Sequence, residues 1–398
     1  MTVPGSPHRA WIEVDHAAIR SNLAVIRRSA PAAQVIGVVK ANGYGHGAVP
    51  VARTLVASGV ERLAIATVDE AIELREAGID VPLLLLWGIG PDEASIVTEH
   101  ALEPIIYDDR AIELLEAAGD RDGVRIGVHL KVDTGLGRQG ATPDEAIALA
   151  VRIARSRHLR LVGTMSHLAV PGEDDAYTEV QVLRLARALD GMRSAGVDPG
   201  IVHVSASGGL LAGALTFADA VRPGLALYGL QPAWAADRDA GLIPALSLLA
   251  RPLRLFDLRA GEAIGYGLRF RATRDTRIAT LGIGYGDGWP RVHANNGWVL
   301  VRGRLAPVVG AISMDGLTVD LGGIDGVTYG DEFVLIGAQD GARITADQVA
   351  AERRTINYEV TTALRERLPR LHRESTDPGA DPENEGTHGT HRDRRLAG

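Results

Sequence analysis

The feature that most restricts the possible folds is a regular alternation of short apolar runs and amphipathic stretches between residues 35 and 221. We expect the apolar runs to be strands, at residues 35–39, 63–66, 82–86, 104–107, 124–132, 159–165, 201–205 and 219–221. Most are separated by stretches with helical spacing of apolar residues, at 68–77, 92–100, 110–118, 143–156 and 177–194. Strands alternating with helices indicate parallel βα units, and eight such units form a (β/α)8 barrel of the TIM type. An open doubly wound sheet is less well supported, because no G-x-G-x-x-G string follows the first strand.

The alternation ends near Pro244, where short β-like runs separated by glycine turns begin. Strands without intervening helices favour a second, mostly β domain, with a more helical segment at residues 345–364. We therefore predict a barrel domain at residues 10–240 and a β-rich domain at residues 241–372.

The two ends of the chain carry separate predictions. Residues 10–14 alternate like an edge strand, and Asp15 is a suitable N-cap for the helix that follows. Residues 373–398 are polar and charged with almost nothing apolar, which predicts a disordered tail. We expect His388 and His391 in this tail to be solvated and to bind no metal.

The composition excludes several classes of function. The chain has 398 residues and a formal net charge of −8, which disfavours nucleic acid as a partner because such a partner requires a basic face. The absence of cysteine excludes disulfides, thiolate chemistry and cysteine-based metal sites, and we predict no metal. No apolar stretch reaches the roughly 20 residues that span a bilayer, and the first residues lack the apolar region of a secretory signal. We expect a cytoplasmic protein with no membrane partner.

The first indication of chemistry lies in residues 35–47. Lys40 follows a buried strand, and a buried ammonium must be paired or neutralised. Three glycines then alternate with Tyr44 and His46, which lets the backbone turn sharply and approach a ligand. A solvated lysine beside an ordinary glycine turn explains the residue types equally well. The functional interpretation is a lysine that traps the carbonyl of an anionic cofactor as a Schiff base.

Polar groups follow four further candidate strands. In a barrel, the carboxyl ends of the strands form one face, so these side chains are expected to meet. Each alone has an ordinary structural explanation, such as a core histidine or an arginine in an ion pair. The groups are Lys131, Asp133 and Arg138 after the fifth strand, Ser166 and His167 after the sixth, Ser205 and Ser207 after the seventh, and Arg222 and Gly224 after the eighth.

Three strings at these positions resemble motifs of the alanine racemases. Val-Val-Lys-Ala-Asn-Gly-Tyr-Gly-His-Gly, at residues 38–47, resembles the family's pyridoxal 5′-phosphate (PLP) lysine motif V-V-K-A-N-A-Y-G-H-G, with Gly43 as the only change. Lys-Val-Asp-Thr-Gly-Leu-Gly-Arg, from residue 131, resembles K-V-D-T-G-M-G-R. Val-Arg-Pro-Gly-Leu-Ala-Leu-Tyr-Gly-Leu, from residue 221, resembles V-R-x-G-x-x-x-Y-G-L. The resemblance covers roughly residues 9–372 and implies a PLP enzyme of fold type III, a barrel followed by a β domain.

The resemblance, together with what PLP requires, assigns cofactor-binding roles. Arg138 binds the phenolic oxygen, and Lys131 is a candidate for carbamylation that would position this arginine. Arg222 faces the pyridine nitrogen and keeps it unprotonated, because an arginine does not surrender its proton at physiological pH. His167 orients Arg222 through a hydrogen bond. The groups expected to bind the phosphate are Tyr44, Ser207, the backbone of Gly224 and Leu225, and Tyr358.

Racemisation moves a proton off one face of Cα and onto the other, so two bases are the simplest arrangement. Lys40 serves one face. Gly-Tyr-Gly-Asp-Gly-Trp-Pro-Arg, at residues 284–291, resembles the family's G-Y-A-D-G-x-P-R, and this resemblance assigns Tyr285 as the second base, reaching the partner subunit's PLP in a homodimer with shared active sites. Without the resemblance, a tyrosine packed in a glycine turn would be the better interpretation. Met314 opens the family's M-D pair, which implies that its backbone N–H, with Arg138, binds the substrate carboxylate.

Three positions depart from the family's pattern. Ala206 replaces an asparagine before the phosphate-binding serine, Ala311 replaces an arginine that helps form the gate to the site, and Gly316 replaces a glutamine after Met-Asp. Two of these changes lie near the entrance and the substrate, so we predict a wider or less basic mouth.

The expected reaction is the interconversion of L-alanine and D-alanine, which supplies D-alanine for peptidoglycan. Three alternatives remain: a racemase of another small amino acid such as serine, a PLP decarboxylase of the same architecture, and a PLP carrier without turnover. Arg222 argues against the decarboxylase, which sets an acidic residue against the pyridine nitrogen, and Tyr285 argues against the carrier.

Overall fold

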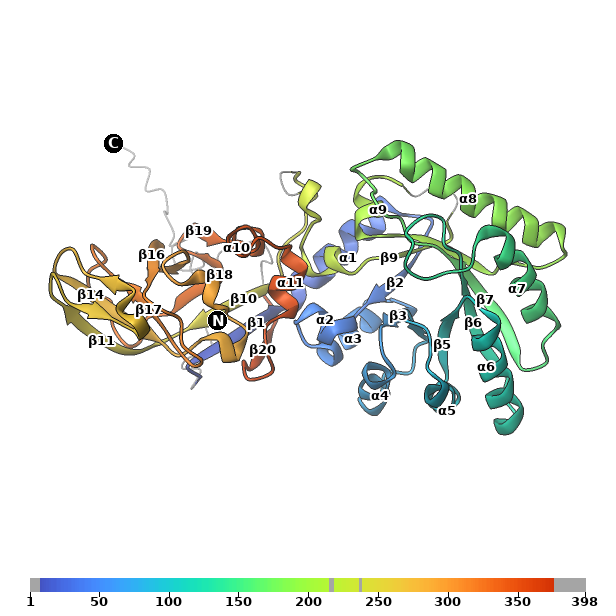
Figure 1. Ribbon diagram of the computed structural model, residues 1–398, viewed down its shortest axis with the longest axis horizontal. Helices are drawn as coiled ribbons and strands as arrows, with labels where there is room; N and C mark the ends of the chain where they lie inside the picture. The colour runs from blue at the N-terminus through green and yellow to red at the C-terminus, as the bar shows by residue number, and fades with distance from the viewer. Residues whose placement is uncertain (1–7, 215–217, 236–237, 376–398) are drawn as a thin grey trace, which may run out of the picture. The chain divides into compact units, whose positions relative to one another are not determined.

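The structure is a computed structural model that describes residues 8–214, 218–235 and 238–375. The chain forms two compact units (Figure 1). The barrel unit consists of Asp15–Ala245 and Ile356–Ala363, and the β unit of the remaining described residues. Each unit is therefore built from separate chain segments. The predicted disordered tail lies outside the described residues, apart from residues 373–375.

Eight parallel strands form the closed barrel that the alternation predicted. Each strand pairs with the next one along the chain, and the last pairs with the first, so the barrel has no open edge. The strands are β2 (Gln34–Val38), β3 (Arg62–Ile65), β4 (Leu83–Leu85), β5 (Leu102–Ile106), β6 (Ile126–Lys131), β7 (Leu159–Met165), β8 (Ile201–Ala206) and β9 (Ala220–Arg222).

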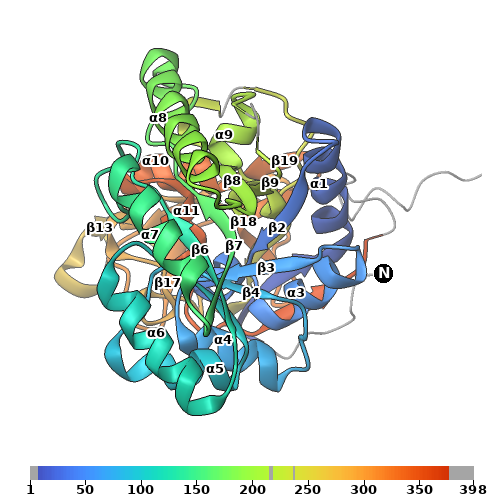
Figure 2. The same ribbon diagram turned by 90° about the vertical axis from the view of Figure 1, so that its right-hand side faces the viewer.

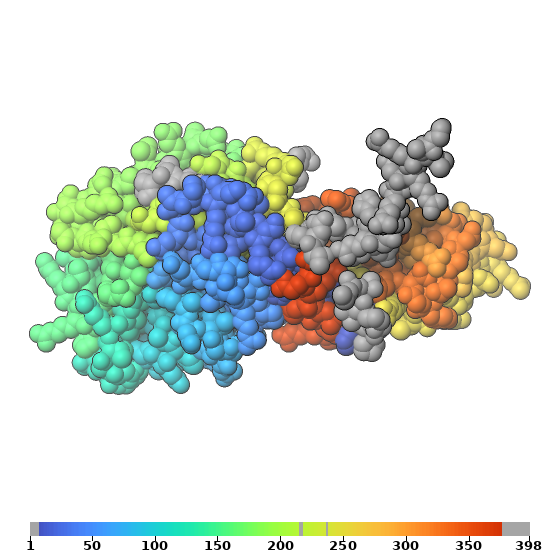
Figure 3. All heavy atoms as spheres, turned by 180° about the vertical axis from the view of Figure 1, so that it is seen from behind, coloured from blue at the N-terminus to red at the C-terminus, as the bar shows by residue number. Residues whose placement is uncertain are grey.

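Helices surround these strands (Figure 2). The outer helices are α1 (His16–Ser29), α3 (Ala48–Ala57), α4 (Val68–Glu76), α5 (Ala94–Glu99), α6 (Asp109–Asp122), α7 (Pro143–Arg155) and α8 (Asp175–Ser194). Several begin at side-chain caps that satisfy free N–H groups, such as Asp15 before α1 and the Thr67–Glu70 capping box of α4. Seen from behind, successive segments from blue to green form neighbouring patches of the barrel unit's surface (Figure 3).

Short elements follow the strands at their carboxyl ends, where the site is expected. They are α2 (Lys40–Tyr44), the 3-10 turn η1 (Pro91–Glu93), α9 (Ser207–Leu211), and the 3-10 turns η2 (Leu225–Tyr228) and η3 (Ala233–Ala235). The last part of the unit is α11 (Asn357–Thr362), which arrives from the far end of the chain.

Antiparallel strands build the β unit. Among the described residues, ten strands form one sheet, in the order β11-β14-β17-β16-β15-β18-β10-β1-β20 with β19 paired to β18. These strands are β1 (Ala10–Asp15), β10 (Leu246–Ala250), β11 (Pro252–Leu258), β14 (Thr276–Leu281), β15 (Trp298–Val301), β16 (Arg304–Val309), β17 (Leu317–Asp320), β18 (Phe333–Gln339), β19 (Ala342–Ile344) and β20 (Arg370–Arg373). A small hairpin, turns and one helix complete the unit: β12 (Ala263–Ile264), η4 (Tyr266–Leu268), β13 (Phe270–Arg271), η5 (Tyr285–Asp287), η6 (Arg291–His293) and α10 (Ala346–Arg353).

The prediction of an edge strand at the N-terminus is wrong. β1 lies between β10 and β20, in the interior of the sheet. Both of its faces are covered, and Trp11 and Ile12 are almost fully buried. The alternation of apolar and polar residues in β1 is due to Glu13 alone, and this carboxylate pairs with Arg373 of β20 at 2.8 Å. A charged residue paired with the neighbouring strand therefore gives the same sequence pattern as a residue on an exposed face.

Candidate active site

Lys40 directly follows the first barrel strand and begins a turn with an unusual backbone. Ala41, Asn42 and Gly43 have φ angles of 51°, 52° and 60°, and Tyr44 has a φ of 53°. For a residue other than glycine, the left-handed helical conformation costs roughly 1–2 kcal/mol. The turn therefore depends on contacts from its surroundings, and strain of this kind is typical of functional sites.

Glu70 supplies one of these contacts. One carboxylate oxygen accepts the N–H of Ala41 at 2.7 Å, and the other accepts the N–H of Ala66, just after β3, also at 2.7 Å. The carboxylate thus ties the residue after Lys40 to the neighbouring strand, and so fixes the point from which the lysine side chain starts.

Gly45 provides another contact, because it lets α11 approach the turn. A Cβ at this position would lie only 2.1 Å from the carbonyl oxygen of Thr361 in α11. The close approach brings Tyr358, on the same helix, to Tyr44, with ring centroids 6.3 Å apart. A segment from the far end of the chain thereby completes this part of the site.

Four cationic side chains act on one another at these strand ends. Burial, and then Arg138, lower the pKa of Lys40; Arg222 lowers it further, whereas Glu70 opposes the shift. Burial and the same two arginines lower the pKa of Lys131 to about 8. A lowered pKa favours the neutral amine, which is the form that attacks a carbonyl. The excess of positive charge also favours an anionic ligand.

Arg222, at the end of β9, is buried, and both terminal nitrogens of its guanidinium make hydrogen bonds. Its Nη1 donates to the carbonyl oxygen and the Nδ1 of His203, at 2.7 and 2.9 Å. Its Nη2 donates to the carbonyl oxygens of Ser166 and Val204, at 2.7 and 3.0 Å, and lies 3.3 Å from the Nδ1 of His167. Burial lowers the pKa of Arg222 to about 9, so the guanidinium remains charged at neutral pH.

Hydroxyl and backbone N–H groups form a cradle beside this arginine. The Oγ of Ser207 accepts the N–H groups of Gly224 and Ala226, both at 3.1 Å. A Cβ at Gly224 would lie 2.3 Å from the hydroxyl oxygen of Tyr44, so the hydroxyl reaches this backbone only because the residue is glycine. Burial raises the pKa of Tyr44, which keeps its hydroxyl a hydrogen-bond donor. Such donors suit a phosphate group.

Lys131 and Arg138 belong to one loop after β6. The Nζ of Lys131 donates to Oε1 of Gln139 at 3.1 Å, and the Nε2 of Gln139 donates to the carbonyl oxygen of Trp87 at 3.0 Å. The guanidinium of Arg138 lies 5.1 Å from the centroid of the Trp87 ring. Trp87 therefore supports both cationic residues of the loop.

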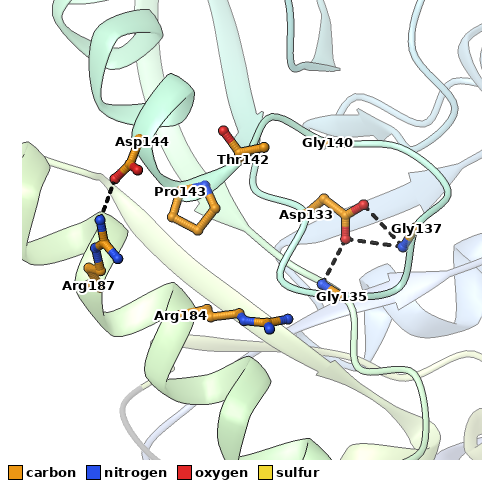
Figure 4. A pocket seen from close by; sticks show the side chains of 9 residues that line it. All are labelled: Asp133, Gly135, Gly137, Gly140, Thr142, Pro143, Asp144, Arg184 and Arg187. Carbon is orange, nitrogen blue, oxygen red and sulfur yellow. Dashed lines mark hydrogen bonds and ion pairs between the residues drawn. The ribbon is translucent and has the colours of Figure 1, made fainter.

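Other residues of the same loop border an open cavity of about 430 Å³ (Figure 4). The carboxylate of Asp133 curls the loop by accepting the N–H groups of Gly135 and Gly137, at 2.9 and 3.0 Å. Arg184 and Arg187 line the cavity, whereas the four cationic side chains described above do not. We therefore assign no cofactor role to this cavity.

In the β unit, Tyr285 and Met314 lie side by side. The N–H of Tyr285 donates to the carbonyl oxygen of Ser313 at 3.1 Å, and the N–H of Gly286 donates to that of Met314 at 2.8 Å. The buried carboxylate of Asp287 pairs with two arginines and braces the turn. The side chains are partly open to solvent, with exposed fractions of 39% for Tyr285 and 51% for Met314. The β unit thus presents the two residues together at its surface.

Three residues escaped the sequence analysis. Tyr266, with an exposed fraction of 76%, occupies a Gly-Tyr-Gly tripeptide like those around Tyr44 and Tyr285, and this repetition is the signal that could have identified it. His203 is a lone histidine within an apolar strand, and its only signal is that a buried imidazole needs a partner. Glu70 reads as an ordinary capping-box residue, which it also is.

Two further observations concern other kinds of site. Within the ranges that the structure describes, no group of three or more histidine and acidic side chains is arranged to hold a metal ion. No helix in the same ranges has the length and apolar character needed to cross a membrane.

Comparison with known proteins agrees with the resemblance of the motifs. The family model described as "Alanine racemase, N-terminal domain" matches residues 14–232, and that described as "Alanine racemase, C-terminal domain" matches residues 245–372. The alanine racemase of Symbiobacterium thermophilum is 40% identical over 363 residues, which are 91% of this chain and 96% of that protein.

Solved structures agree as well. The alanine racemase of Streptomyces lavendulae has a TM-score of 0.87 and 33% identity, over 93% of this chain and 98% of that one. That of Bartonella henselae, described with covalently bound pyridoxal phosphate, has a TM-score of 0.82 and 29% identity, over 92% of this chain and all of the other. On this evidence, the chain belongs to the alanine racemase family of isomerases.

Proposed function

We propose that this chain is a PLP-dependent racemase that interconverts L-alanine and D-alanine. The observation that carries the proposal is the convergence of Lys40, Arg222 and a hydroxyl-lined cradle at the carboxyl ends of the barrel strands. Membership of the family supports the reaction. The pyridoxal phosphate named for the Bartonella henselae structure supports the cofactor.

The donors at the strand ends fit PLP. The hydroxyls of Tyr44, Ser207 and Tyr358, with the backbone N–H groups of Gly224 and Leu225, would hold its phosphate. The glycine at 224 supports this assignment, since any Cβ there would displace the Tyr44 hydroxyl. When bound, PLP supplies an aldehyde that reacts with amines and a ring that withdraws electrons from the substrate's α-carbon.

Two arginines tune this chemistry. Arg222, which can only donate hydrogen bonds, would face the pyridine nitrogen and keep it unprotonated, with His167 supporting its orientation. An unprotonated ring withdraws electrons less strongly, which favours prompt return of a proton to Cα. Arg138 would bind the phenolic oxygen and the substrate carboxylate.

Lys131 is the candidate for carbamylation. In that step its neutral Nζ attacks CO2, a nitrogen–carbon bond forms, and one proton passes to solvent. The lowered pKa of Lys131, about 8, supports the step because it increases the neutral fraction of the amine. The resulting anion would lie among cations and could hold Arg138 in place.

Two bases would act on opposite faces of the substrate. Lys40 removes or returns the Cα proton on one face. A tyrosine from the β unit of a partner subunit serves the other, and the sequence nominates Tyr285. Tyr266 is a second candidate, because its side chain is more exposed, 76% against 39%. Exposure favours Tyr266, since the ring must reach a pocket that its own β unit does not form.

The remaining assignments rest on the family resemblance. The backbone N–H of Met314 would bind the substrate carboxylate. The enzyme would act as a homodimer with shared active sites, in the cytoplasm, and would supply D-alanine for peptidoglycan.

A racemase of another small amino acid, such as serine, is the second candidate. The observation that favours it is the small side chain at Ala311, which packs with an exposed fraction of 9% where the family places an arginine. A wider mouth would admit a side chain larger than methyl.

Two measurements test the proposal. A visible absorbance band that borohydride abolishes in the native protein, but that is missing in Lys40→Ala, is expected for PLP on Lys40. Incorporation of solvent deuterium at Cα, with loss of optical activity, is then expected for alanine. Faster exchange with serine would favour the second candidate, and release of CO2 without exchange would refute racemisation.

A further inference from the structure

A line of polar side chains runs through the interior of the barrel toward Arg222. The interiors of such barrels are normally filled with branched apolar side chains. Here His203 on β8 and His129 on β6 are fully buried, with their rings edge to face at 4.9 Å and 76°. Glu103 on β5 lies next to them. Burying these groups costs free energy unless each finds a partner, so packing alone does not explain them.

The contacts form one continuous chain of hydrogen bonds. The Nη1 of Arg222 lies 2.9 Å from the Nδ1 of His203, and the Nε2 of His203 lies 2.8 Å from the Nδ1 of His129. The Nε2 of His129 lies 3.3 Å from the Oε2 of Glu103. Arg62, at the start of β3, then donates to the same carboxylate at 2.8 Å. The chain of contacts thus crosses the barrel from the amino end of β3 to the carboxyl end of β9.

The chemistry of arginine gives this chain a direction. A guanidinium has donors only, so the Nδ1 of His203 must accept and the hydrogen must sit on its Nε2. His203 then donates to the Nδ1 of His129, which places the hydrogen of His129 on Nε2, directed at Glu103. Both imidazoles are therefore neutral Nε2–H tautomers, and the three bonds from Arg222 to Glu103 all point from the cation to the carboxylate, which Arg62 meets from the other side.

Neighbouring groups agree with this arrangement. Burial lowers the pKa of both histidines, which keeps the imidazoles neutral. Burial raises the pKa of Glu103, but hydrogen bonds from His129 and Arg62 outweigh this and lower it to about 2, so Glu103 is an anion. A Cβ at Gly163 on β7 would lie 2.5 Å from the carbonyl oxygen of Ile201 and 2.7 Å from the Nδ1 of His129, so glycine leaves room for both the strand and the ring.

Glu103 also supplies a negative charge, which none of the hydrogen-bond acceptors described for Arg222 carries. The acceptors described for the Arg222 guanidinium are backbone carbonyls and imidazole nitrogens, all of them neutral. A buried cation normally has a carboxylate partner. Hydrogen-bonded chains polarise one another in a low dielectric, so a carboxylate at the far end stabilises the cation through the two imidazoles.

We propose that Glu103 and His129 are positioning residues, which act through His203 to hold Arg222 charged, oriented and unable to pass its proton down the barrel. Arg222 can lose a proton in this direction only if both imidazoles change tautomer. The proposal rests on the proposed function, because it concerns the residue expected to face the cofactor's ring nitrogen.

The first test needs no cofactor, and it uses variants only to assign resonances. In cofactor-free wild-type protein labelled with ¹⁵N-histidine, the resonances of residues 129 and 203 are expected to be those of neutral Nε2–H tautomers, assigned by comparison with His129→Gln and His203→Gln. A proton on Nδ1 of either ring, or a cationic imidazole at neutral pH, would overturn the directed chain.

The second test uses the holoenzyme. Glu103→Gln keeps the shape of the side chain and removes its charge. Because loss of such an outer partner typically costs 10- to 100-fold in metal sites, we expect kcat to fall about tenfold in both directions with little change in KM, and the cofactor's absorbance maximum to shift. The control is Glu332→Gln, which removes a comparable Glu–Arg pair, with Arg251 at 2.8 Å, in the β unit. Glu332→Gln is expected to change neither kcat nor the cofactor's absorbance maximum.

The outcomes separate the two proposals. A wild-type protein without the PLP band refutes the proposed function, while the tautomers of the cofactor-free protein still decide whether the directed chain exists. A wild-type racemase whose Glu103→Gln variant keeps its spectrum and kcat refutes the positioning role alone. If Glu103→Gln does not fold, the tautomer measurement on the wild type decides.

Discussion

The carboxylate of Glu70 accepts the backbone N–H of Ala41 at 2.7 Å, one residue after Lys40. It joins a left-handed turn, which is costly in isolation, to the neighbouring strand of the barrel. The same carboxylate raises the pKa of Lys40 against the stronger lowering by burial and Arg138. Glu70 therefore affects both where the amine sits and how readily it loses its proton.

Replacing Glu70 with glutamine should separate these effects from ordinary helix capping. The amide offers only one acceptor oxygen, so one of the two bonds to backbone N–H groups is lost, at a cost of about 0.5–1.5 kcal/mol in the free energy of unfolding. The pKa of Lys40 should fall further, which pH-dependent chemical modification of the amine measures. The control is Glu145→Gln, because Glu145 accepts the N–H of Thr142 in the capping box of α7. An equal change in the reactivity of Lys40 in both variants would contradict the assignment.

Gly45→Ala should destabilise the protein more than its backbone angle alone explains. Gly45 has a φ of 84°, and its Cβ would lie 2.1 Å from the Thr361 carbonyl. Gly78 has a similar φ of 77° with open space around its Cβ position, so Gly78→Ala measures the conformational cost alone, about 1 kcal/mol. In urea unfolding, the free energy of unfolding of Gly45→Ala should be well below that of Gly78→Ala. Equal losses would mean that α11 moves away at no cost.

The barrel could be predicted because its signal is local. Each βα unit repeats the same apolar pattern within a few tens of residues, and closure of eight parallel strands then follows from packing. The strand ends meet on one face of any such barrel, so the positions of Lys40, Lys131, Arg138, His167 and Arg222 near one another were predictable without side-chain detail. The role of each residue stays a prediction.

What could not be predicted depends on contacts between distant segments. β1 reads as an edge strand because nothing local shows that β20 will cover it. Tyr358 reaches Tyr44 only because Gly45 admits α11. The pairing of His129 with His203 joins two strands that are not neighbours in the barrel, and no sequence pattern predicts it. Contacts between distant segments leave no repeating pattern in the sequence from which they could be predicted.

The identity of the second base can be determined by comparing the rates of proton removal from the two enantiomers. If one tyrosine serves one face of Cα, its replacement by phenylalanine should slow proton removal from one enantiomer at least tenfold more than from the other. Because the side chain of Tyr266 is the more exposed of the two, we expect this difference between enantiomers for Tyr266→Phe. For Tyr285→Phe we expect a smaller loss that is equal for both enantiomers. Deuterium exchange at Cα of each enantiomer measures it. The reverse result would assign the role to Tyr285, and symmetric losses in both variants would refute a tyrosine base.

The β unit should lose stability in mild acid through His293. This buried ring lies 2.9 Å from the Oε2 of Glu352 and accepts from the Nε of Arg353 at 2.8 Å. Burial and then Arg353 lower its pKa to about 3, below the value of about 6.5 expected in the unfolded chain. The unfolded state therefore binds the extra proton first, and the stabilisation is present above about pH 6.5 and lost as the pH falls toward 3.

His293→Gln tests this prediction, because glutamine fills similar space and does not titrate. The difference in thermal midpoint between wild type and variant should be largest at neutral pH and should shrink between pH 6.5 and 4, measured by the intrinsic fluorescence of the tryptophans. A difference that stays constant over this range would show that the ring does not carry the pH dependence.

The alanine at position 311 offers the sharpest test of the substrate gate. The backbone nitrogen of Ala311 would lie 3.4 Å from a Cβ at Gly265, so residue 311 adjoins the turn that carries Tyr266. Ala311→Arg and Ala311→Gln both add bulk beside this turn, the first with a charge and the second without. Both variants should slow the racemisation of serine more than that of alanine, because both narrow the mouth, and kcat/KM for each amino acid measures the change. A change in selectivity in the arginine variant alone would attribute the effect to charge, and unchanged selectivity in both would place the gate elsewhere.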